Sequence, residues 1–530
     1  MINPEQLIST LVKEAVKSIY NLNVDEKLLQ TQATRKEFEG DITAIMFPLL
    51  KISKSLPEQT GEEIGAYLLK SSKEVESFNV VKGFLNIKLT DNYWLNAFKT
   101  IFNSSDWGSS PSSGKAVMVE FSSPNTNKPL HLGHIRNNLL GWSLSKLMEA
   151  NGHTVIKVNL VNDRGVHICK SMLAWIKLSG KETPQNSGIK GDHLVGKYYV
   201  AFNNLLKDEI ESLVKGGMSR EEAEKEAQEM LVKWERGDNE VVELWKTMNG
   251  WVYEGFDRTY ARLGISFDKI YYESETYLLG KKLVQEGLER AVFYTKEDGS
   301  VWCDLSDEGL DEKLLLRADG TSVYITQDLG TAHQRFSEYK LDEHIYVVGN
   351  EQNYHFQVLK LLLKKLGFSW YKNTHHLSYG MVELPDGKMK SREGTVVDAD
   401  DLIANMVNTA RETSLELGKM EEIEKGEQEH LFEMLGLGAL KYFIIKVDPR
   451  KTMLFDPDES IDFNGNTGPF IQYTHARIRS IIRKALEQGL SGKITGSALN
   501  NREREIIKIL NQFPEKIKEG GKEYSPAILP

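Results

Sequence analysis

Cysteine and long apolar segments are what this sequence has least of. Its 530 residues include only Cys169 and Cys303, and two cysteines without metal-ligand spacing predict neither a disulfide framework nor a zinc site. No run of about 18 apolar residues occurs, so no membrane span is expected. The first twenty residues also lack the apolar core and cleavage site of a secretory signal. These absences favour a cytoplasmic protein without a tightly bound metal or other cofactor.

The glycine-rich fingerprints of common nucleotide sites are missing too. Neither G-x-G-x-x-G nor a Walker A sequence occurs, so the sequence predicts neither an ordinary dinucleotide site nor a P-loop. The net charge of -10 argues against general coating of nucleic acid, but residues 470–530 carry 11 Lys and Arg against 6 Asp and Glu. Such a basic region fits a phosphate-backbone partner, although a solvated helix face would have the same composition.

Residues 1–110 are expected to form a small α/β accessory domain. The apolar spacing predicts helices over Leu7–Tyr20 and Gly61–Leu69, and Val80–Leu89 alternates like strands around Gly83. The stretch SSDWGSSPSS at residues 104–113 has the composition of a linker.

Strand and helix signals alternate through the next part of the chain, residues 111–455. That alternation predicts a parallel, doubly wound sheet with ligands at the carboxyl ends of its strands. Residues 181–300 interrupt the pattern with the charged helix Glu221–Glu235, and we interpret them as an insertion. The predicted strands are Ala116–Phe121, Thr154–Leu160, Ser322–Ile325 and Ile345–Val348.

The chain is predicted to become helical after about residue 400. Asp401–Leu417, Glu427–Ile445 and Phe470–Gln488 all have helical periodicity. Residues 456–530 would form a separate helical domain.

The stretch SSPNTNKPLHLGH, from Ser122 to His134, lies between a predicted strand and a predicted helix. A helix N-terminus there offers free backbone N–H groups to phosphate. His131 and His134 could donate hydrogen bonds to a phosphoryl oxygen that gains charge during reaction. Gly133 would let a flat base approach the backbone. A four-residue H-x-G-H pattern also arises by chance, but the strand–loop–helix setting favours a nucleotide site.

This stretch resembles the signature of class I aminoacyl-tRNA synthetases, and the form EFSSPN…KP.H.GH is most similar to the arginyl-tRNA synthetase family. The resemblance extends along nearly the whole chain. It implies a Rossmann-like α/β catalytic domain, an N-terminal α/β domain that contacts the tRNA elbow, and a C-terminal all-α anticodon-binding domain that looks incomplete. The implied reaction joins L-arginine to tRNA(Arg) with ATP and Mg²⁺ as substrate, in a monomeric enzyme.

The resemblance also implies an ATP site. Residues 387–394, GKMKSREG, resemble the mobile lysine loop of class I enzymes. Ser391 stands where the second lysine usually lies, so Lys128 is expected to supply the missing charge, the alternative being an exposed loop lysine. The implied catalytic and ATP-binding residues are Lys128, His131, Gly133, His134, Gly380, Met381, Val382, Lys388, Met389, Lys390 and Ser391.

A planar guanidinium is best matched by carboxylates at fixed angles. By resemblance Asp328 and Glu273 hold this group, Glu120 and Asn125 hold the α-amino end, Tyr324 packs on the stem and Gln352 closes the pocket. For each, a helix cap or a surface ion pair is the alternative, and for Glu273 it is nearly as good.

The segment GNTGPFIQYTHARIRSI resembles the opening of the family's anticodon-binding domain, and its implied tRNA contacts are Gln472, Tyr473, His475, Arg477 and Arg479. Other functions stay open: another H-x-G-H synthetase or nucleotidyltransferase, or a tRNA-binding relative without catalysis.

Overall fold

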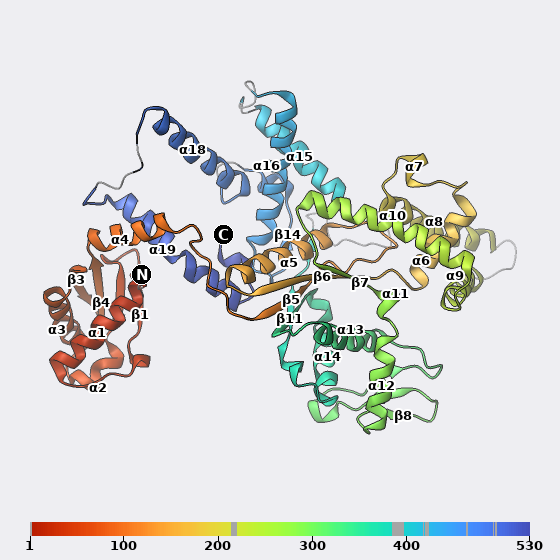
Figure 1. Ribbon diagram of the computed structural model, residues 1–530, viewed down its shortest axis with the longest axis horizontal. Coiled ribbons are helices and arrows are strands. Elements are labelled where there is room, and N and C mark those ends of the chain that lie inside the picture. The colour runs from red at the N-terminus through yellow and green to blue at the C-terminus, as the bar shows by residue number, and fades with distance from the viewer. Residues whose placement is uncertain are drawn as a thin grey trace. The chain divides into compact units, whose positions relative to one another are not determined.

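The chain divides into two compact units, described here one at a time (Figure 1). The first holds residues 1–109 and 485–516, and the second holds 110–484 and 517–530. The computed structural model describes residues 3–530 apart from 214–219, 384–396, 417, 419–422, 463–464, 491 and 493–495. Among the described helices, none combines the length and the hydrophobicity needed to cross a bilayer.

A four-stranded antiparallel sheet, in the order β1-β2-β4-β3, is the centre of the first unit. Alternation along β4 buries Leu85, Ile87 and Leu89, and the apolar face of α1 covers them with Ile8 and Val12. The predicted helices of this region correspond to α1 and α3. The elements are α1 (Pro4–Tyr20), β1 (Thr31–Ala33), β2 (Ile42–Ile45), α2 (Leu50–Ser53), α3 (Pro57–Ser71), β3 (Val75–Val81), β4 (Phe84–Leu89) and α4 (Asp91–Asn103).

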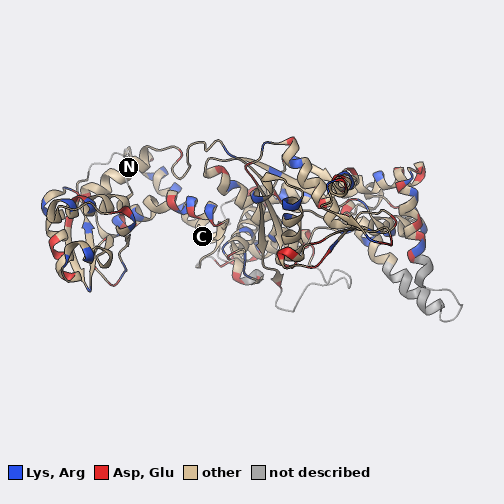
Figure 2. Ribbon diagram, turned by 90° about the horizontal axis from the view of Figure 1, so that it is seen from below, with Lys and Arg blue, Asp and Glu red and all other residues tan. Residues whose placement is uncertain are grey.

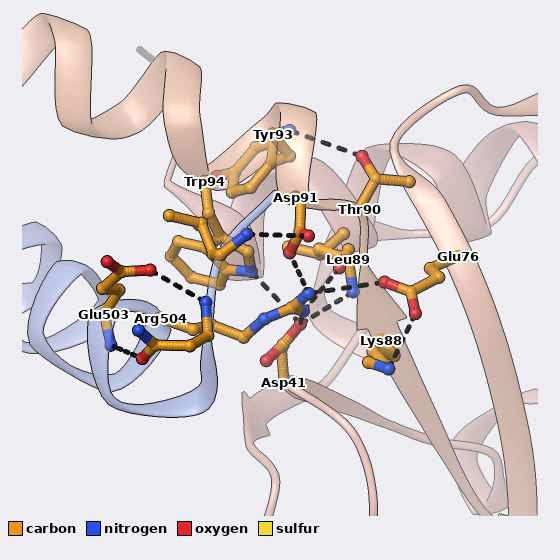
Figure 3. A network of polar contacts seen from close by, with 12 residues as sticks. Asp41, Glu76, Lys88, Leu89, Thr90, Asp91, Tyr93, Trp94, Glu503 and Arg504 are labelled. Atoms are coloured by element: carbon orange, nitrogen blue, oxygen red, sulfur yellow. Dashed lines mark hydrogen bonds and ion pairs between the residues drawn. The ribbon is translucent and has the colours of Figure 1, made fainter. Parts of the chain in front are cut away.

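The first unit also takes in the start of α19 (Asn501–Lys522), far away in the sequence. Ile507 joins the apolar core of the unit. Arg504 inserts among carboxylates (Figure 3), with Asp91 as its nearest ion-pair partner and with Glu76 and Asp41 at 3.4 and 3.6 Å. Each of these ions has an opposite charge beside it, so burial of the guanidinium is compensated.

A five-stranded parallel sheet, in the order β12-β11-β5-β6-β7, is the centre of the second unit. Successive residues of β5 face opposite sides, so Val117 and Val119 enter one apolar cluster while Met118 enters another. The predicted doubly wound α/β class is therefore confirmed. The strands are β5 (Ala116–Glu120), β6 (Thr154–Val161), β7 (Lys269–Tyr272), β11 (Glu343–Gly349) and β12 (Thr374–Tyr379).

Helices cover both faces of this sheet and continue beyond it (Figure 1). Those up to β7 are α5 (Leu132–Ala150), α6 (Val166–Leu178), α7 (Pro184–Ser187), α8 (Gly191–Leu213), α9 (Arg220–Glu235) and α10 (Asn239–Leu263). Later helices are α11 (Glu273–Thr276), α12 (Leu279–Glu289), α13 (Tyr324–Glu338), α14 (Asn353–Lys365), α15 (Ala399–Glu416), α16 (Lys425–Ile445), α17 (Pro457–Ser460) and α18 (Gly468–Glu487). Short strands form two further sheets: β8 (Tyr294–Thr295), β9 (Val301–Cys303) and β10 (Lys313–Leu316), then β13 (Val382–Glu383) and β14 (Met453–Leu454).

The strand predicted over Ser322–Ile325 is wrong. Ser322 makes only an isolated bridge to Leu316, and α13 begins at Tyr324. Ile325, Leu329 and Ala332 are buried at helical spacing, so the apolar face of an amphipathic helix outweighs the local β preference of the run.

The predicted insertion, residues 181–300, contains a strand of the main sheet. β7 pairs with β6 through Val158↔Lys269 to Val161↔Tyr272. Its four residues are too few to show a pattern beside the long helices α8 and α10. The strand places Glu273 at the carboxyl edge of the sheet.

Candidate active site

The signature stretch lies where the sequence places it, between β5 and α5. His131 is the N-cap of α5, and its Nδ1 accepts a hydrogen bond from the Gly133 amide at 3.1 Å. His134 Nδ1 accepts from the His131 amide at 3.2 Å, so the two rings form a reciprocal cap with centroids 3.9 Å apart. Two of the otherwise unpaired amides of the helix start are thereby used by the histidines.

The cap fixes the protonation of both imidazoles. Burial, and then the nearby Lys128 ammonium, lower the pKa of His131 to about 4. Burial, and then His131 and Lys128, lower the pKa of His134 well below its usual value. A neutral imidazole whose Nδ1 accepts carries its proton on Nε2. Each ring therefore presents one N–H donor, the form required to stabilise charge on a phosphoryl oxygen.

The position of the His131 ring explains why residue 133 is a glycine. A β-carbon there would lie 2.9 Å from Cε1 and 3.0 Å from Nδ1 of the His131 ring. The cap geometry therefore leaves no room for a side chain at this position. Sequence reasoning explained the glycine by approach of a base, and the structure adds this intramolecular cause.

A short backbone strap, residues 397–399, holds the signature from the other side. The Leu132 amide donates to the Val397 carbonyl at 3.1 Å, and the Ala399 amide donates to the Leu130 carbonyl at 3.0 Å. His131 and Asp398 thus form an antiparallel bridge. The strap ties the backbone of the first histidine to the start of α15.

A cavity of about 470 Å³ opens beside the signature. Four of the residues predicted for the site line it: Asn125, Lys128, His131 and Tyr324. Burial lowers the pKa of Lys128, and no carboxylate of the described residues lies within ion-pair distance of its ammonium. His193 and Tyr199 of α8 and His167 of α6 form part of the opposite wall.

A cluster of acids, Asp163, Glu273 and Asp328, lies at the carboxyl end of the sheet and the start of α13. The pKa of Glu273 is raised to about 7, mainly by burial; the nearby Arg164 opposes this shift, and the carboxylates of Asp163 and Asp328 add to it. Asp328 accepts a hydrogen bond from His355 Nε2 at 2.5 Å. Negative charge is concentrated here without an equal number of cations, so a cationic ligand would be stabilised.

Asp163 holds the backbone of this acidic cluster in place through three hydrogen bonds. It accepts hydrogen bonds from the amide and the hydroxyl of Ser274, at 2.8 and 2.7 Å, and from the Tyr253 hydroxyl at 2.9 Å. Ser274 follows Glu273 directly, so these bonds fix the backbone that carries the carboxylate.

Glu120 behaves differently from the other acids. Its carboxylate is 2.6 Å from Nη1 of the buried Arg335 and 3.4 Å from His344. Burial alone would raise the pKa of Glu120, but Arg335, followed by His344, holds it below its usual value. The charge of Glu120 is already matched within the protein, and a contact with the α-amino group of arginine stays a prediction.

Family models match three stretches of the chain. "tRNA synthetases class I (R), catalytic domain" covers residues 99–456, "DALR anticodon binding domain" covers 471–530 and "Arginyl tRNA synthetase N terminal domain" covers 6–89. The arginine–tRNA ligase of Parabacteroides distasonis is 57% identical over 99% of this chain and 90% of its own length. That of Flavobacterium psychrophilum is 53% identical over the same shares.

The chain belongs to the arginyl-tRNA synthetase family.

Solved structures agree with this assignment. The Thermus thermophilus arginyl-tRNA synthetase matches with a TM-score of 0.76 and 25% identity, over 99% of this chain and 89% of that one. The Plasmodium falciparum enzyme has a fold match with a TM-score of 0.72 at 20% identity, over 98% and 88% of the two chains.

The remaining residues predicted from the family resemblance have mixed settings. Gln352 is exposed in the turn after β11. The Gly380 amide donates to the Pro449 carbonyl and the Met381 carbonyl accepts from the Met453 amide, while Val382 is buried in β13. These backbone groups are therefore used by the fold. The predicted loop residues Lys388, Met389, Lys390 and Ser391 lie outside the described residues.

The predicted tRNA contacts are on α18, the opening helix of the region that the anticodon-binding model matches. Gln472 packs inward and donates to the Met434 carbonyl at 3.0 Å. The other four are exposed, and the Arg477 guanidinium lies 5.7 Å from the centre of the Tyr473 ring. Lys and Arg are interspersed with Asp and Glu over the described residues (Figure 2). The exposed four, Tyr473, His475, Arg477 and Arg479, remain candidates for RNA contact.

Sequence reasoning missed several residues that shape the site. Asp163 lies in the segment N-D-R-G directly after β6, and an acid in that position is a usable signal. Arg335 and His355 lie inside helices, and nothing local shows that they face acids. Arg335 meets Glu120 of β5, and His355 of α14 meets Asp328 of α13, only in the folded chain.

Proposed function

We propose that this chain ligates L-arginine to tRNA(Arg) in an ATP-dependent reaction, with Glu273 and Asp328 selecting the amino acid. Membership of the arginyl-tRNA synthetase family supports the reaction. The observation that carries the choice of substrate is the group of carboxylates around Glu273, which has a pKa of about 7 and no ion-pair partner among the described residues. A guanidinium is always charged and planar, and would relieve the repulsion between the two carboxylates.

Three of the predicted arginine-binding residues lie at the same edge of the parallel sheet, which supports a single substrate site. Asn125 follows β5, Glu273 follows β7 and Gln352 follows β11, all at carboxyl ends of parallel strands. Ligands of open α/β sheets bind at that edge. The cavity lined by Lys128, His131 and Tyr324 would then hold the reacting groups.

In the first step a carboxylate oxygen of arginine attacks the α-phosphorus of ATP. The bond from that phosphorus to the bridging oxygen breaks, giving arginyl-adenylate and pyrophosphate. The Nε2–H groups of His131 and His134 and the ammonium of Lys128 would stabilise the charge that develops on the phosphoryl oxygens. Mg²⁺ would enter with ATP as part of the substrate, and we assign no residue to it.

In the second step the terminal ribose hydroxyl of the tRNA attacks the carbonyl carbon of the adenylate. AMP leaves with the electron pair of the acyl bond, and the hydroxyl proton is released. Exposed Tyr473, Arg477 and Arg479 of α18 would contact the RNA, because arginine guanidinium groups and aromatic rings suit phosphates and unstacked bases.

We further propose a monomer that works in the cytoplasm without zinc. Both cysteines, Cys169 and Cys303, are free and buried, which suits a reduced compartment. Light scattering of the purified protein and metal analysis test the first and last of these points.

Replacing Asp328 with Asn tests the function and the pocket together. The change keeps the shape but leaves the guanidinium with less charge opposite, so arginine binding should weaken by about 2–5 kcal/mol, or roughly 30- to 5,000-fold in Michaelis constant. The assay is aminoacylation of tRNA(Arg) across all twenty amino acids. Asp311→Asn, an exposed acid of the same unit, is the matched control and should behave like the parent.

Two outcomes would contradict the proposal. ATP consumption that does not depend on arginine and tRNA would favour another H-x-G-H enzyme, and none at all would favour a tRNA-binding relative without catalysis. An unchanged Michaelis constant for arginine in Asp328→Asn would remove the pocket assignment but leave the reaction standing.

A further inference from the structure

A charged cluster lies behind the cavity, where α8, α10 and the start of α15 meet. We call Lys190, Asp192, His193, Thr259, Asp398 and Asp400 the Lys190 cluster. The Lys190 ammonium donates to Asp400 Oδ2 at 2.6 Å, to Thr259 Oγ1 at 2.6 Å and to Asp192 Oδ2 at 3.0 Å. His193 Nε2 is 3.2 Å from Asp400 and 3.3 Å from Asp398.

The cluster is buried and has its own cation. The Asp192 side chain is fully buried, and those of Lys190 and Asp400 are 16% and 23% exposed. Asp192, His193 and Asp400 offer ligand atoms within 4.8 Å of one another, but the Lys190 ammonium already stands between two of the carboxylates. A metal ion would have to displace it, so the arrangement is that of an internal ion-pair lock.

The lock is connected to the catalytic histidine through the strap. Asp398 Oδ1 accepts the amides of Asp400 and Asp401, at 2.8 and 3.2 Å, and so caps α15. Val397 and Ala399, on either side of this cap, make the two backbone hydrogen bonds to Leu132 and Leu130 described above. His193 and Asp398 also line the cavity that contains Lys128 and His131.

We propose that Lys190 and Asp400 are positioning residues for phosphoryl transfer. They clamp the strap to the helices of the insertion, and the strap holds His131 where its Nε2–H meets the phosphoryl oxygen. Neither residue lines the cavity, so their effect reaches the reaction through the backbone. This role rests on the proposed function, because it concerns the same site.

The test uses Asp400→Asn and Lys190→Met in the full chain. A displacement of about 1 Å in a catalytic group costs on the order of a hundredfold in rate, so we expect turnover per active site to fall roughly 10- to 100-fold. The measurement is arginine-dependent pyrophosphate exchange with tRNA present, with functional sites counted by active-site titration. The Michaelis constant for arginine should stay within about twofold, because Glu273 and Asp328 are not in the cluster.

Two controls separate positioning from stability. Lys190→Arg keeps the cation and should recover most of the turnover. Lys246→Met removes an exposed ion pair of α10, at 2.9 Å from Glu243, and should leave turnover unchanged. Asp400→Asn keeps the size of the side chain and one of its two acceptor oxygens, so it disturbs the packing less than Lys190→Met and provides the second, milder variant.

The outcomes are distinguishable. Loss of titratable sites with full turnover at the remaining ones, or turnover within twofold of the parent in Asp400→Asn, would overturn the positioning role. A parent protein without arginine-dependent exchange would instead contradict the proposed function.

Discussion

Two glutamates of the same unit, the buried Glu120 and the half-buried Glu273, differ in the charges that lie beside them. Glu120 faces the guanidinium of Arg335, which holds its pKa below the usual value against burial. Glu273 has no ion-pair partner among the described residues, and burial, with the charges of Asp163 and Asp328 and against that of Arg164, raises its pKa to about 7. A buried charge that is matched inside the protein serves the fold, whereas one that is unmatched is poised for a ligand of opposite charge.

The cations follow the same division. Arg504 is surrounded by Asp41, Glu76 and Asp91 (Figure 3). Lys128, by contrast, has no carboxylate partner among the described residues, and burial lowers its pKa. Of these two ions Lys128 lines the cavity beside the signature, and the contact of Glu273 with a cationic substrate stays a prediction.

Breaking the matched pair should have the largest effect. Arg335→Met leaves the Glu120 carboxylate buried without its cation, and we expect the free energy of unfolding to fall by about 3–5 kcal/mol. Denaturant unfolding of the full chain, followed by a probe of the second unit, measures this.

The double variant Glu120→Gln, Arg335→Met is the control. Removing both charges should recover most of the stability, because no ion is then left unpaired. If the double variant is as unstable as Arg335→Met, lost packing rather than lost charge explains the effect, and the comparison fails for this pair.

Removing the unmatched cation should leave stability intact and reduce catalysis. Lys128→Ala takes away one preorganised contact to the charge on the phosphates, which costs about 2.7–4 kcal/mol in comparable cases, or roughly a hundred- to a thousandfold in turnover. The fall should be in kcat rather than in the Michaelis constant for arginine. A kcat within about threefold of the parent, under roughly 1 kcal/mol, would make Lys128 an ordinary loop lysine.

Local sequence patterns predict the elements of the site but not which buried ions are paired with an opposite charge. Local patterns sufficed for β5, α5 and the signature between them, because an apolar strand and a proline-stiffened loop can be read over a few residues. Arg335 could not be paired with Glu120 in this way, since the two are joined only by the fold. The same holds for β7, whose four residues carry no pattern of their own.

At Tyr324 a local pattern was present but predicted the wrong element, a strand in place of helix α13. The run SVYI has local β preference, yet the buried positions Ile325, Leu329 and Ala332 decide for a helix. Asp328 was still assigned to the arginine pocket, because that assignment came from the family motif rather than from the predicted strand.

Acidic pH should weaken arginine binding through Glu273. With a pKa of about 7 in the free protein, the carboxyl must lose its proton to meet a guanidinium that stays charged at all pH values. The dissociation constant for arginine should therefore rise as pH falls below 7, by up to about tenfold per pH unit. Calorimetry in buffers of different ionisation enthalpy should show release of about half a proton at pH 7.

Glu273→Gln sharpens this result. The variant should bind arginine more weakly above pH 7, and the dependence assigned to Glu273 should disappear. A pH dependence that survives in Glu273→Gln would have to come from another group, and the unmatched acid would not be the selector.

The smallest effect is expected where a matched ion is exposed. Glu76 pairs with Lys88 at 2.7 Å and with Arg504 at 3.4 Å, and its side chain is 39% exposed. Water can replace both contacts, so Glu76→Gln should change the free energy of unfolding by less than about 1 kcal/mol. Arg504 keeps Asp41 and Asp91, and donates to the Leu89 carbonyl at 2.8 Å, so no buried charge is left alone. Hydrogen exchange of β4 and denaturant unfolding report on this unit. A loss of unfolding free energy as large as that of Arg335→Met would show that an ion pair stabilises the fold equally whether it is buried or exposed. Burial would then not explain the difference between these pairs.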